Sequence, residues 1–262
     1  PRALIYPRST LKFAQASAVA ALGVTFSSEG TVLSTASHAG TPAHTAVVVE
    51  MLAQSGLDES SLQCPPDWPA DGAARRAATQ PTRLAMNCSG KHAAFLAACV
   101  EHGWERDTYL DPAHPLQQQV LRTVEAFAGE TISHLGVDGC GAPVPVISLT
   151  GLARIASRSG RTGTLLGDAI REHPWAIDGP GRANTVTIER TGLVAKLGAE
   201  GVLVLVTPSG EAVAVKVLDG SHRATTAIGL EVLVRAGLLP RDTAAETLAE
   251  LADPTARIRV SF

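Results

Sequence analysis

One short stretch, Met86–Leu96, concentrates side chains that can carry chemistry. Its letters, MNCSGKHAAFL, place a thiol, a hydroxyl, an amine and an imidazole within five positions, at Cys88, Ser89, Lys91 and His92. Cys88 and Lys91 are three residues apart, so on a helix they share one face. Polar and ionisable groups are costly to bury together unless they are paired or serve a purpose. The stretch therefore predicts a functional site.

A second thiol, Cys140, lies in the block Asp138–Pro143, which reads DGCGAP. Glycine on both sides leaves its sulfur and the nearby N–H groups open to approach. Two thiolates and a nitrogen suit a tetrahedral zinc, and three protein ligands with one open position suit a catalytic zinc. The nitrogen could come from His92, or from Lys91 if the metal holds its amine neutral. The alternative is a buried structural Cys88 and an unrelated cysteine in a turn.

A serine and a lysine at Ser9 and Lys12 form a further candidate pair. On a helix the lysine lies one turn from the serine. A serine hydroxyl needs a base, and lysine serves as one only when desolvation or a nearby positive charge lowers its pKa. The spacing also fits a serine at a helix start followed by a solvated lysine. Taken by itself, the spacing favours that interpretation.

Two other positions could approach such a pair. Ser37 and His38 lie in a loop of turn-forming residues and could line a pocket, although such a loop is also typical of a simple turn with a surface histidine. Lys196 ends an apolar segment before a glycine-rich turn, which predicts a lysine at a sheet edge or an ordinary hairpin. Cys64 and Cys99 are interpreted as bystanders.

The elements that must position these groups follow from apolar spacing and turn residues. Helices are predicted at 7–22, 44–55, 92–103, 115–127, 147–157, 164–173, 221–236 and 243–251. Strands of an antiparallel meander are predicted at 192–196, 201–207 and 212–218. The polar segment 64–81 indicates a loop excursion or lid. The sum is one α+β domain over 1–262, a helical cluster on a central antiparallel sheet.

Composition excludes several classes of protein. The chain has 262 residues, 45% of them apolar, and a net charge of −3 without basic runs, so neither nucleic acid nor a membrane is an expected partner. Four cysteines in a chain of this length do not form a disulfide framework, which favours reduced thiols in the cytoplasm. The sequence starts at Pro1, without Met and close to a candidate motif, so we expect residues upstream.

Five blocks, taken in order, resemble the thermolabile, Rhizobium etli-type L-asparaginases, the asparaginase II-like family. The blocks are Arg8-Ser9-x-x-Lys12, Ala36-Ser37-His38-x-Gly40, Cys88-Ser89-Gly90-Lys91-His92, Asp138-Gly139-Cys140-Gly141-Ala142-Pro143 and Lys196-x-Gly198-Ala199-Glu200-Gly201. The third and fourth blocks are specific to that family, and the likeness extends to about Ala236. It implies the fold of serine β-lactamases and penicillin-binding proteins, and a homodimer. The strands that precede the first block in the family are absent from this sequence.

The resemblance also implies a reaction, the hydrolysis of L-asparagine to L-aspartate and ammonia. Ser9 would be the nucleophile and Lys12 its base, with Ser37 and Lys196 as a second pair in the same pocket. Zinc would bind Cys88, Lys91, Cys140 and a water. Arg8, His38, His92 and Asp138 are the residues expected around the substrate.

Three positions depart from the family pattern: Phe13 replaces a usual proline, and Ala39 and Thr41 replace a common serine and glutamate. Two alternatives follow. One is a catalytically silent zinc-binding relative, although a structural metal site would not require both serine–lysine pairs. The other is the same machinery acting on glutamine or on a β-lactam-like ring, since a pocket discriminates one methylene by only about 1–3 kcal/mol.

Overall fold

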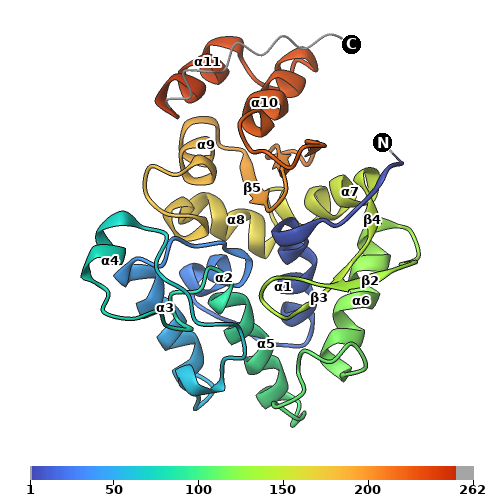
Figure 1. The fold of residues 1–262 in the computed structure, drawn as a ribbon. Coiled ribbons are helices and arrows are strands. Elements are labelled where there is room, and N and C mark those ends of the chain that lie inside the picture. Colours follow the sequence, from blue (N-terminus) through green and yellow to red (C-terminus); the bar gives the residue numbers. More distant parts are fainter. Residues whose placement is uncertain (1, 252–262) are drawn as a thin grey trace.

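A three-stranded antiparallel sheet lies among the helices of the molecule (Figure 1). The computed structural model describes residues 2–251. The strands β5 (Val194–Gly198), β6 (Val202–Val206) and β7 (Ala212–Lys216) are adjacent in that order. The middle strand reads VLVLV and is buried along its whole length, which is typical of a strand covered on both faces.

The two faces of β6 contact different helices. Leu203 and Leu205 face α10 (Thr225–Arg235), because a Cβ on Gly229 of that helix would lie 2.9 and 2.8 Å from their side chains. Val204 points the other way, since successive side chains alternate along a strand. Lys196 of β5 is directly opposite Val204, so its amine is on that second face.

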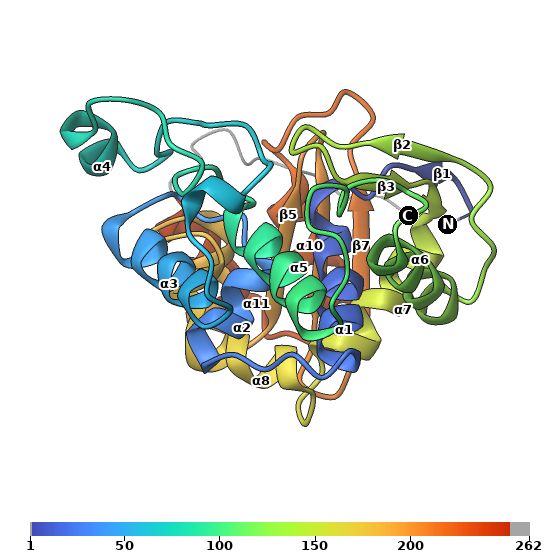
Figure 2. The same ribbon diagram turned by 90° about the horizontal axis from the view of Figure 1, so that it is seen from below.

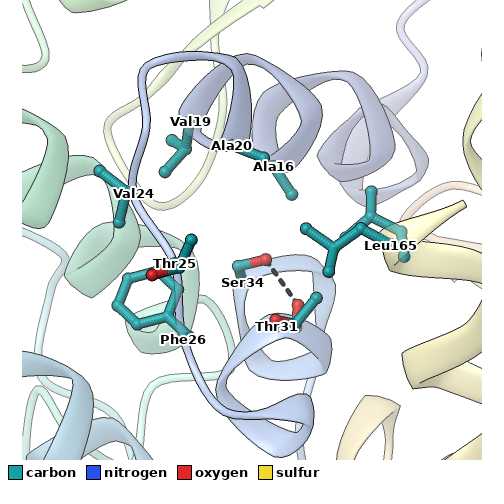
Figure 3. Close-up of a pocket in the computed structure, with 10 residues that line it drawn as sticks. Ala16, Val19, Ala20, Val24, Thr25, Phe26, Thr31, Ser34 and Leu165 are labelled. Carbon is teal, nitrogen blue, oxygen red and sulfur yellow. Dashed lines mark hydrogen bonds between the residues drawn. The ribbon is translucent and has the colours of Figure 1, made fainter.

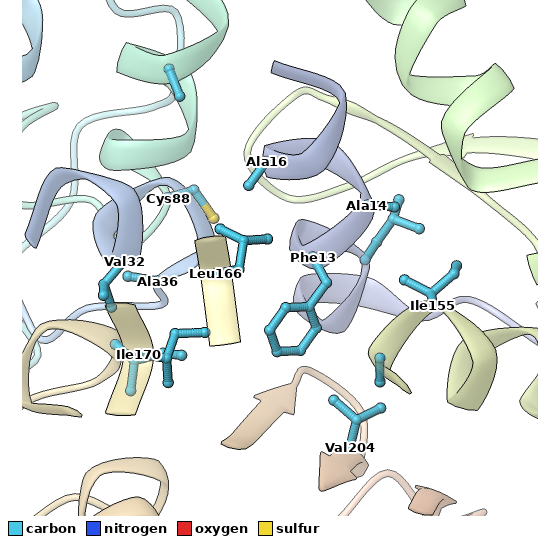
Figure 4. Packing of buried hydrophobic residues seen from close by; sticks show 14 of the residues in the cluster. Phe13, Ala14, Ala16, Val32, Ala36, Cys88, Ile155, Leu166, Ile170 and Val204 are labelled. Carbon is cyan, nitrogen blue, oxygen red and sulfur yellow. The ribbon is translucent and has the colours of Figure 1, made fainter. Parts of the chain in front are cut away.

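The second face of the sheet carries the main core. Figure 4 shows Phe13 of α1 (Lys12–Ala21) and Ile155 of α7 (Leu149–Gly160) close to Val204. All three side chains are buried. The helix that begins the chain therefore packs directly against the strands that come near its end.

The helix α5 (Ser89–Glu101) lies in the centre of the helical cluster and is buried from Ser89 to Cys99. It packs on α1, on α2 (Ser28–Thr35) and on α3 (Pro42–Ala53), as Figure 2 shows. A Cβ on Gly90 would overlap the backbone carbonyl of Leu33 in α2. Glycine at this position therefore allows the close approach of α5 to α2.

The remaining elements complete the helical cluster and two short ribbons. β1 (Leu4–Ile5) pairs with β4 (Ile147–Ser148), and β2 (Leu135–Val137) pairs with β3 (Pro143–Pro145), both antiparallel. The other elements are η1 (Arg8–Leu11), η2 (Glu59–Ser61), α4 (Gly72–Ala77), α6 (Pro115–Ala128), α8 (Leu165–Glu172), η3 (Pro174–Ile177), α9 (Ala183–Thr191) and α11 (Arg241–Glu250).

The α+β architecture predicted from the sequence is confirmed, as a mostly helical chain with small antiparallel sheets. Each predicted helix and strand has a counterpart within a few residues. Two helix starts were wrong: residues 147–148 are a strand and α7 begins at Leu149, and α10 begins at Thr225, four residues after the predicted start. Neither α2 nor α9 was predicted, and α4 and the short strands β1 to β4 were not predicted either. Of the expected domain 1–262, residues 1 and 252–262 lie outside the described part.

The polar segment 64–81, predicted as an excursion or lid, begins at the buried Cys64. It carries α4, which stands away from the other helices in Figure 2, and a bridge between Asp67 and Thr82 closes its base. No helix of residues 2–251 has the length and apolar character needed to cross a membrane.

A small cavity of about 40 Å³ between α1, α2 and α8 is not a candidate site (Figure 3). Its walls are apolar apart from a few hydroxyl groups, and Ser34 uses its hydroxyl to donate to the Thr31 carbonyl. No titratable side chain lines it. The lining residues are Ala16, Val19, Ala20, Val24, Thr25, Phe26, Thr31, Ser34, Leu165 and Leu166.

Candidate active site

Ser9 lies on the turn η1, directly before α1. It is half-buried, and its hydroxyl makes no hydrogen bond with any described residue. A Cβ on Gly198 would lie 2.9 Å from the Pro7 carbonyl, so the end of β5 lies directly against this turn. The contact brings the Ser9 turn close to the strand that carries Lys196. Because the Ser9 hydroxyl has no partner within the described residues, it is available to a ligand.

Both lysines predicted for the site lie within hydrogen-bond distance of the Ser37 hydroxyl. Lys196 Nζ lies 2.7 Å from Ser37 Oγ, and Lys12 Nζ lies 3.3 Å from the same oxygen. Both lysines are buried, and Lys12 also donates to the Ala36 carbonyl. The structure therefore joins Lys12, Ser37 and Lys196 directly, whereas no hydrogen bond joins Lys12 to Ser9 in the described chain.

The loop that carries Ser37 is held by its backbone. Ser37 N–H donates to the Ile177 carbonyl at 3.0 Å, and Ala39 N–H donates to the Asp178 carbonyl at 2.7 Å. These bonds attach the loop after α2 to the segment after η3. They fix the Ser37 hydroxyl where lysines from α1 and β5 can both reach it.

Burial and a neighbouring charge make Lys196 an unusual lysine. Desolvation, followed by the charge of Lys12, lowers the pKa of the Lys196 amine to about 7. Near neutral pH a large fraction of this amine is therefore uncharged. An uncharged amine within hydrogen-bond distance of a hydroxyl can accept a proton from it.

The predicted thiol pair also comes together. Cys88 is the N-cap of α5, and Cys140 lies at the tip of the β2–β3 hairpin, where Lys91 Nζ is 2.8 Å from its sulfur. A hydrogen bond with Cys140, and then the charges of Lys12 and Lys91, lower the pKa of Cys88 well below its ordinary value. The same bond raises the pKa of Cys140. The two shifts have opposite directions, so Cys88 loses its proton at a lower pH than Cys140.

Lys12 links the thiols to the serines, because it donates to Ser37 while its charge lowers the pKa of the Cys88 thiol. The two constellations predicted separately from the sequence are therefore one buried cluster. Burial raises the pKa of Cys64 to about 11 and that of Cys99 to about 12, which keeps both thiols protonated. Both are free thiols, in keeping with the interpretation as bystanders.

Arg8 fixes the hairpin of Cys140 to the Ser9 turn. Its Nε donates to Asp138 Oδ1 at 2.8 Å, and its guanidinium also pairs with Glu200. Arg8 has φ 51°, a left-handed conformation that costs energy for a residue with a side chain. Burial acts to raise the pKa of the Asp138 carboxyl, but the Gly139 N–H and Arg8 together bring it below its ordinary value. Glu200 was not expected in this role.

His38 is buried and both its ring nitrogens have partners. Gly40 N–H donates to Nδ1 at 3.1 Å, so Nε2 carries the proton and donates to Ser89 Oγ at 2.9 Å. Ser89 in turn donates to the Leu84 carbonyl at 2.9 Å. Both hydrogen-bonding groups of the residue expected to bind substrate are thus already used within the protein.

His92 differs from His38 in one respect. Its Nδ1 lies 2.6 Å from the hydroxyl of Tyr109, but its Nε2 is buried without any partner in residues 2–251. Burial lowers the pKa of His92 well below its ordinary value, so the ring is neutral. Tyr109 was missed by the sequence analysis, because it lies in a loop without any motif around it.

Two buried lysines converge on the Ser37 hydroxyl, and one of them lies three residues after Ser9, whose hydroxyl is free within the described chain. These are the groups of a hydrolase that attacks a carbonyl carbon. Comparison with known families gives the same class: the model of the family described as L-asparaginase II matches residues 1–260. The chain belongs to the L-asparaginase II family, which confirms the resemblance seen in its motifs. No protein in a search of curated sequences matches it.

Proposed function

We propose that this chain hydrolyses the side-chain amide of L-asparagine to L-aspartate and ammonia, with Ser9 as the nucleophile and Lys12 as its base. Membership of the L-asparaginase II family implies this substrate. The observation that carries the serine chemistry is the convergence of Lys12 and Lys196 on Ser37. Ser9 lies three residues before Lys12, and its hydroxyl has no hydrogen bond within residues 2–251. A protein that only binds zinc would not need that arrangement.

A proton route follows from these distances. For Lys12 to act as a base it must first give up a proton, and Ser37 lies between it and the Lys196 amine. Lys196 accepts the proton from Ser37 while Ser37 takes one from Lys12. The neutral Lys12 then removes the proton of Ser9 as the serine oxygen attacks the amide carbon.

The tetrahedral intermediate needs donors for its oxyanion. Backbone N–H groups in the first turn of a helix have no partner within the helix, and those at the start of the Ser9 turn are suited to this role. When the C–N bond breaks, Lys12 returns its proton to the leaving ammonia and an acyl-enzyme remains on Ser9. A water molecule, deprotonated by the same lysine, then attacks the acyl carbon. The bond to Ser9 Oγ breaks, Lys12 returns the proton to that oxygen, and L-aspartate is released.

The donor set of the expected zinc fits such an ion. Cys88, Lys91 and Cys140 are all buried, Lys91 Nζ lies 2.8 Å from the Cys140 sulfur, and the charges of Lys12 and Lys91 lower the pKa of Cys88. No group of three or more His, Cys, Asp or Glu among the described residues could hold a metal, so a zinc here would need Lys91 as its nitrogen ligand, as the family resemblance implies. A bound zinc would polarise or orient the substrate. The serine and lysines would remain the reacting groups.

The wider architecture belongs to the same proposal. A helix that begins with the serine–lysine pair and packs on an antiparallel sheet bearing a second lysine supports the fold of serine β-lactamases and penicillin-binding proteins. The family resemblance supports a homodimer, which light scattering on the purified protein tests. Four buried free thiols support a reducing, cytoplasmic location.

Ammonia release tests the proposal. Wild-type protein, Ser9→Ala and the control Ser17→Ala, a serine on the same helix α1, are assayed with L-asparagine and with L-glutamine, with and without zinc. Activity on asparagine that is lost only in Ser9→Ala supports it. Ammonia from glutamine alone would favour the other substrate, and none from either amide with zinc bound would favour a silent relative.

The role of the metal needs a separate comparison. If zinc only orients the substrate, Ser9→Ala abolishes turnover while the Cys140→Ala variant mainly loses affinity for asparagine. Near full activity in Ser9→Ala together with complete loss in Cys140→Ala would contradict a serine nucleophile.

A further inference from the structure

One buried ring nitrogen of the site lacks a hydrogen-bond partner in the described chain, which is unfavourable in free energy. His92 Nε2 is enclosed and has no hydrogen-bond partner among the described residues. His38 and His44, which stack 5.2 Å apart nearby, have partners for both ring nitrogens. A buried polar atom that stays unpaired is unfavourable, so such atoms commonly mark a place where a ligand binds.

Tyr109 determines which nitrogen of His92 carries the proton. The backbone N–H of Gln63 donates to the Tyr109 oxygen at 3.1 Å, so that contact uses the oxygen as an acceptor. The phenol proton then has one acceptor within the described chain, His92 Nδ1 at 2.6 Å. Because Nδ1 accepts, it carries no proton, and the ring proton is on Nε2. The unpaired atom is therefore an N–H donor.

The surroundings of the ring indicate what this donor binds. His92 follows Lys91 on α5, and the charges of Lys91 and Lys12 both act on its ring. Positive neighbours favour an anionic acceptor, and a hydrogen bond to a carboxylate is stronger than one to a neutral oxygen. Within the proposed substrate the anionic acceptor is the α-carboxylate.

We propose that Tyr109 is a positioning residue, which donates to His92 Nδ1 and so keeps an Nε2–H donor directed at the carboxylate of the amide substrate. The inference rests on the proposed function for its substrate, but the proton position does not depend on turnover.

Nitrogen-15 NMR of the imidazole rings tests the proton position. The His92 signals are assigned by their loss in His92→Gln. We expect the Nε2–H form in the wild type and a mixture of both tautomers in Tyr109→Phe, which keeps the aromatic ring and removes the hydroxyl. Tyr6→Phe is the matched control, because the Tyr6 hydroxyl has no hydrogen bond within residues 2–251. A wild-type Nδ1–H form, or an unchanged tautomer in Tyr109→Phe, would overturn the inference.

Kinetics test the role of the donor. In Tyr109→Phe, KM for L-asparagine should rise about tenfold with little change in kcat, the result expected when ground-state binding is lost. In a His92→Gln background, where an amide N–H serves as donor without a tautomer, the same change should add nothing. A loss confined to kcat, or an undiminished loss in the double variant, would contradict it. Inactivity of the wild type on asparagine, with the Nε2–H form present, would instead count against the proposed function.

Discussion

The pH dependence of catalysis follows from the environment of Lys196. The pKa of its amine is lowered from 10.5 to about 7, which corresponds to a destabilisation of the charged form by roughly 5 kcal/mol. The proton route requires the neutral amine, so activity is lost as pH falls through the pKa. We expect kcat/KM for L-asparagine to be level above pH 8, about tenfold lower at pH 6 and about a hundredfold lower at pH 5. Ammonia release measured from pH 5 to 9 gives the profile.

Two controls assign that acid limb to Lys196. Zinc content is measured after incubation at each pH, because protonation of Cys88 and Cys140 would also release a metal. The variant Lys196→Met should lose at least a hundredfold in kcat/KM, and its residual activity should lack the acid limb. An acid limb that persists unchanged in Lys196→Met, or a wild-type rate that stays level down to pH 5 with zinc retained, would refute the reasoning.

Three further predictions concern parts of the site that do not titrate near pH 7. Gly90→Ala should lower the free energy of unfolding, measured in urea, by about 1–3 kcal/mol, because the new Cβ overlaps the α2 backbone. The control is Gly72→Ala in α4, where only an arginine side chain is near. Arg8→Lys should lower kcat/KM about tenfold with an unchanged melting temperature, since lysine cannot bridge both carboxylates; equal activity would contradict the role of Arg8. Ser89→Ala should lower stability by about 1–3 kcal/mol by leaving His38 Nε2 unpaired while kcat is kept, and a lost kcat would make Ser89 catalytic.

The sequence predicts the helices and the meander well because their apolar spacing agrees with the final packing. Its main omission, α9, reads ANTVTIERT. Threonine, valine and isoleucine favour strands locally, and only packing against β5 and α11 makes this segment helical. Local preference is overridden by tertiary contacts here, which no single stretch of sequence contains.

For the site, the sequence indicates which residue types carry chemistry but not how they meet. The blocks around Ser9 and Cys88 suggest a serine–lysine pair and a thiol site. In the structure Lys12 donates to Ser37, and its charge lowers the pKa of Cys88. That Ser37 receives both lysines depends on backbone bonds of its loop, and that Tyr109 reaches His92 depends on the packing of a distant loop. Neither contact has a signature in spacing, because each joins segments placed by the whole fold.

The clamp made by Arg8 has a consequence for the order in which this protein becomes active. Its partners Asp138 and Glu200 are 130 and 192 positions further along the chain, and the contact between Ser37 and Lys196 spans 159 positions. Closing such long loops costs chain entropy and comes late in folding. Ser9 is synthesised well before Lys196 and Glu200, and its surroundings are complete only after the meander has docked. Enzymatic activity should therefore appear in the last phase of refolding, after most of the helical signal, and a nascent chain stays inert until then.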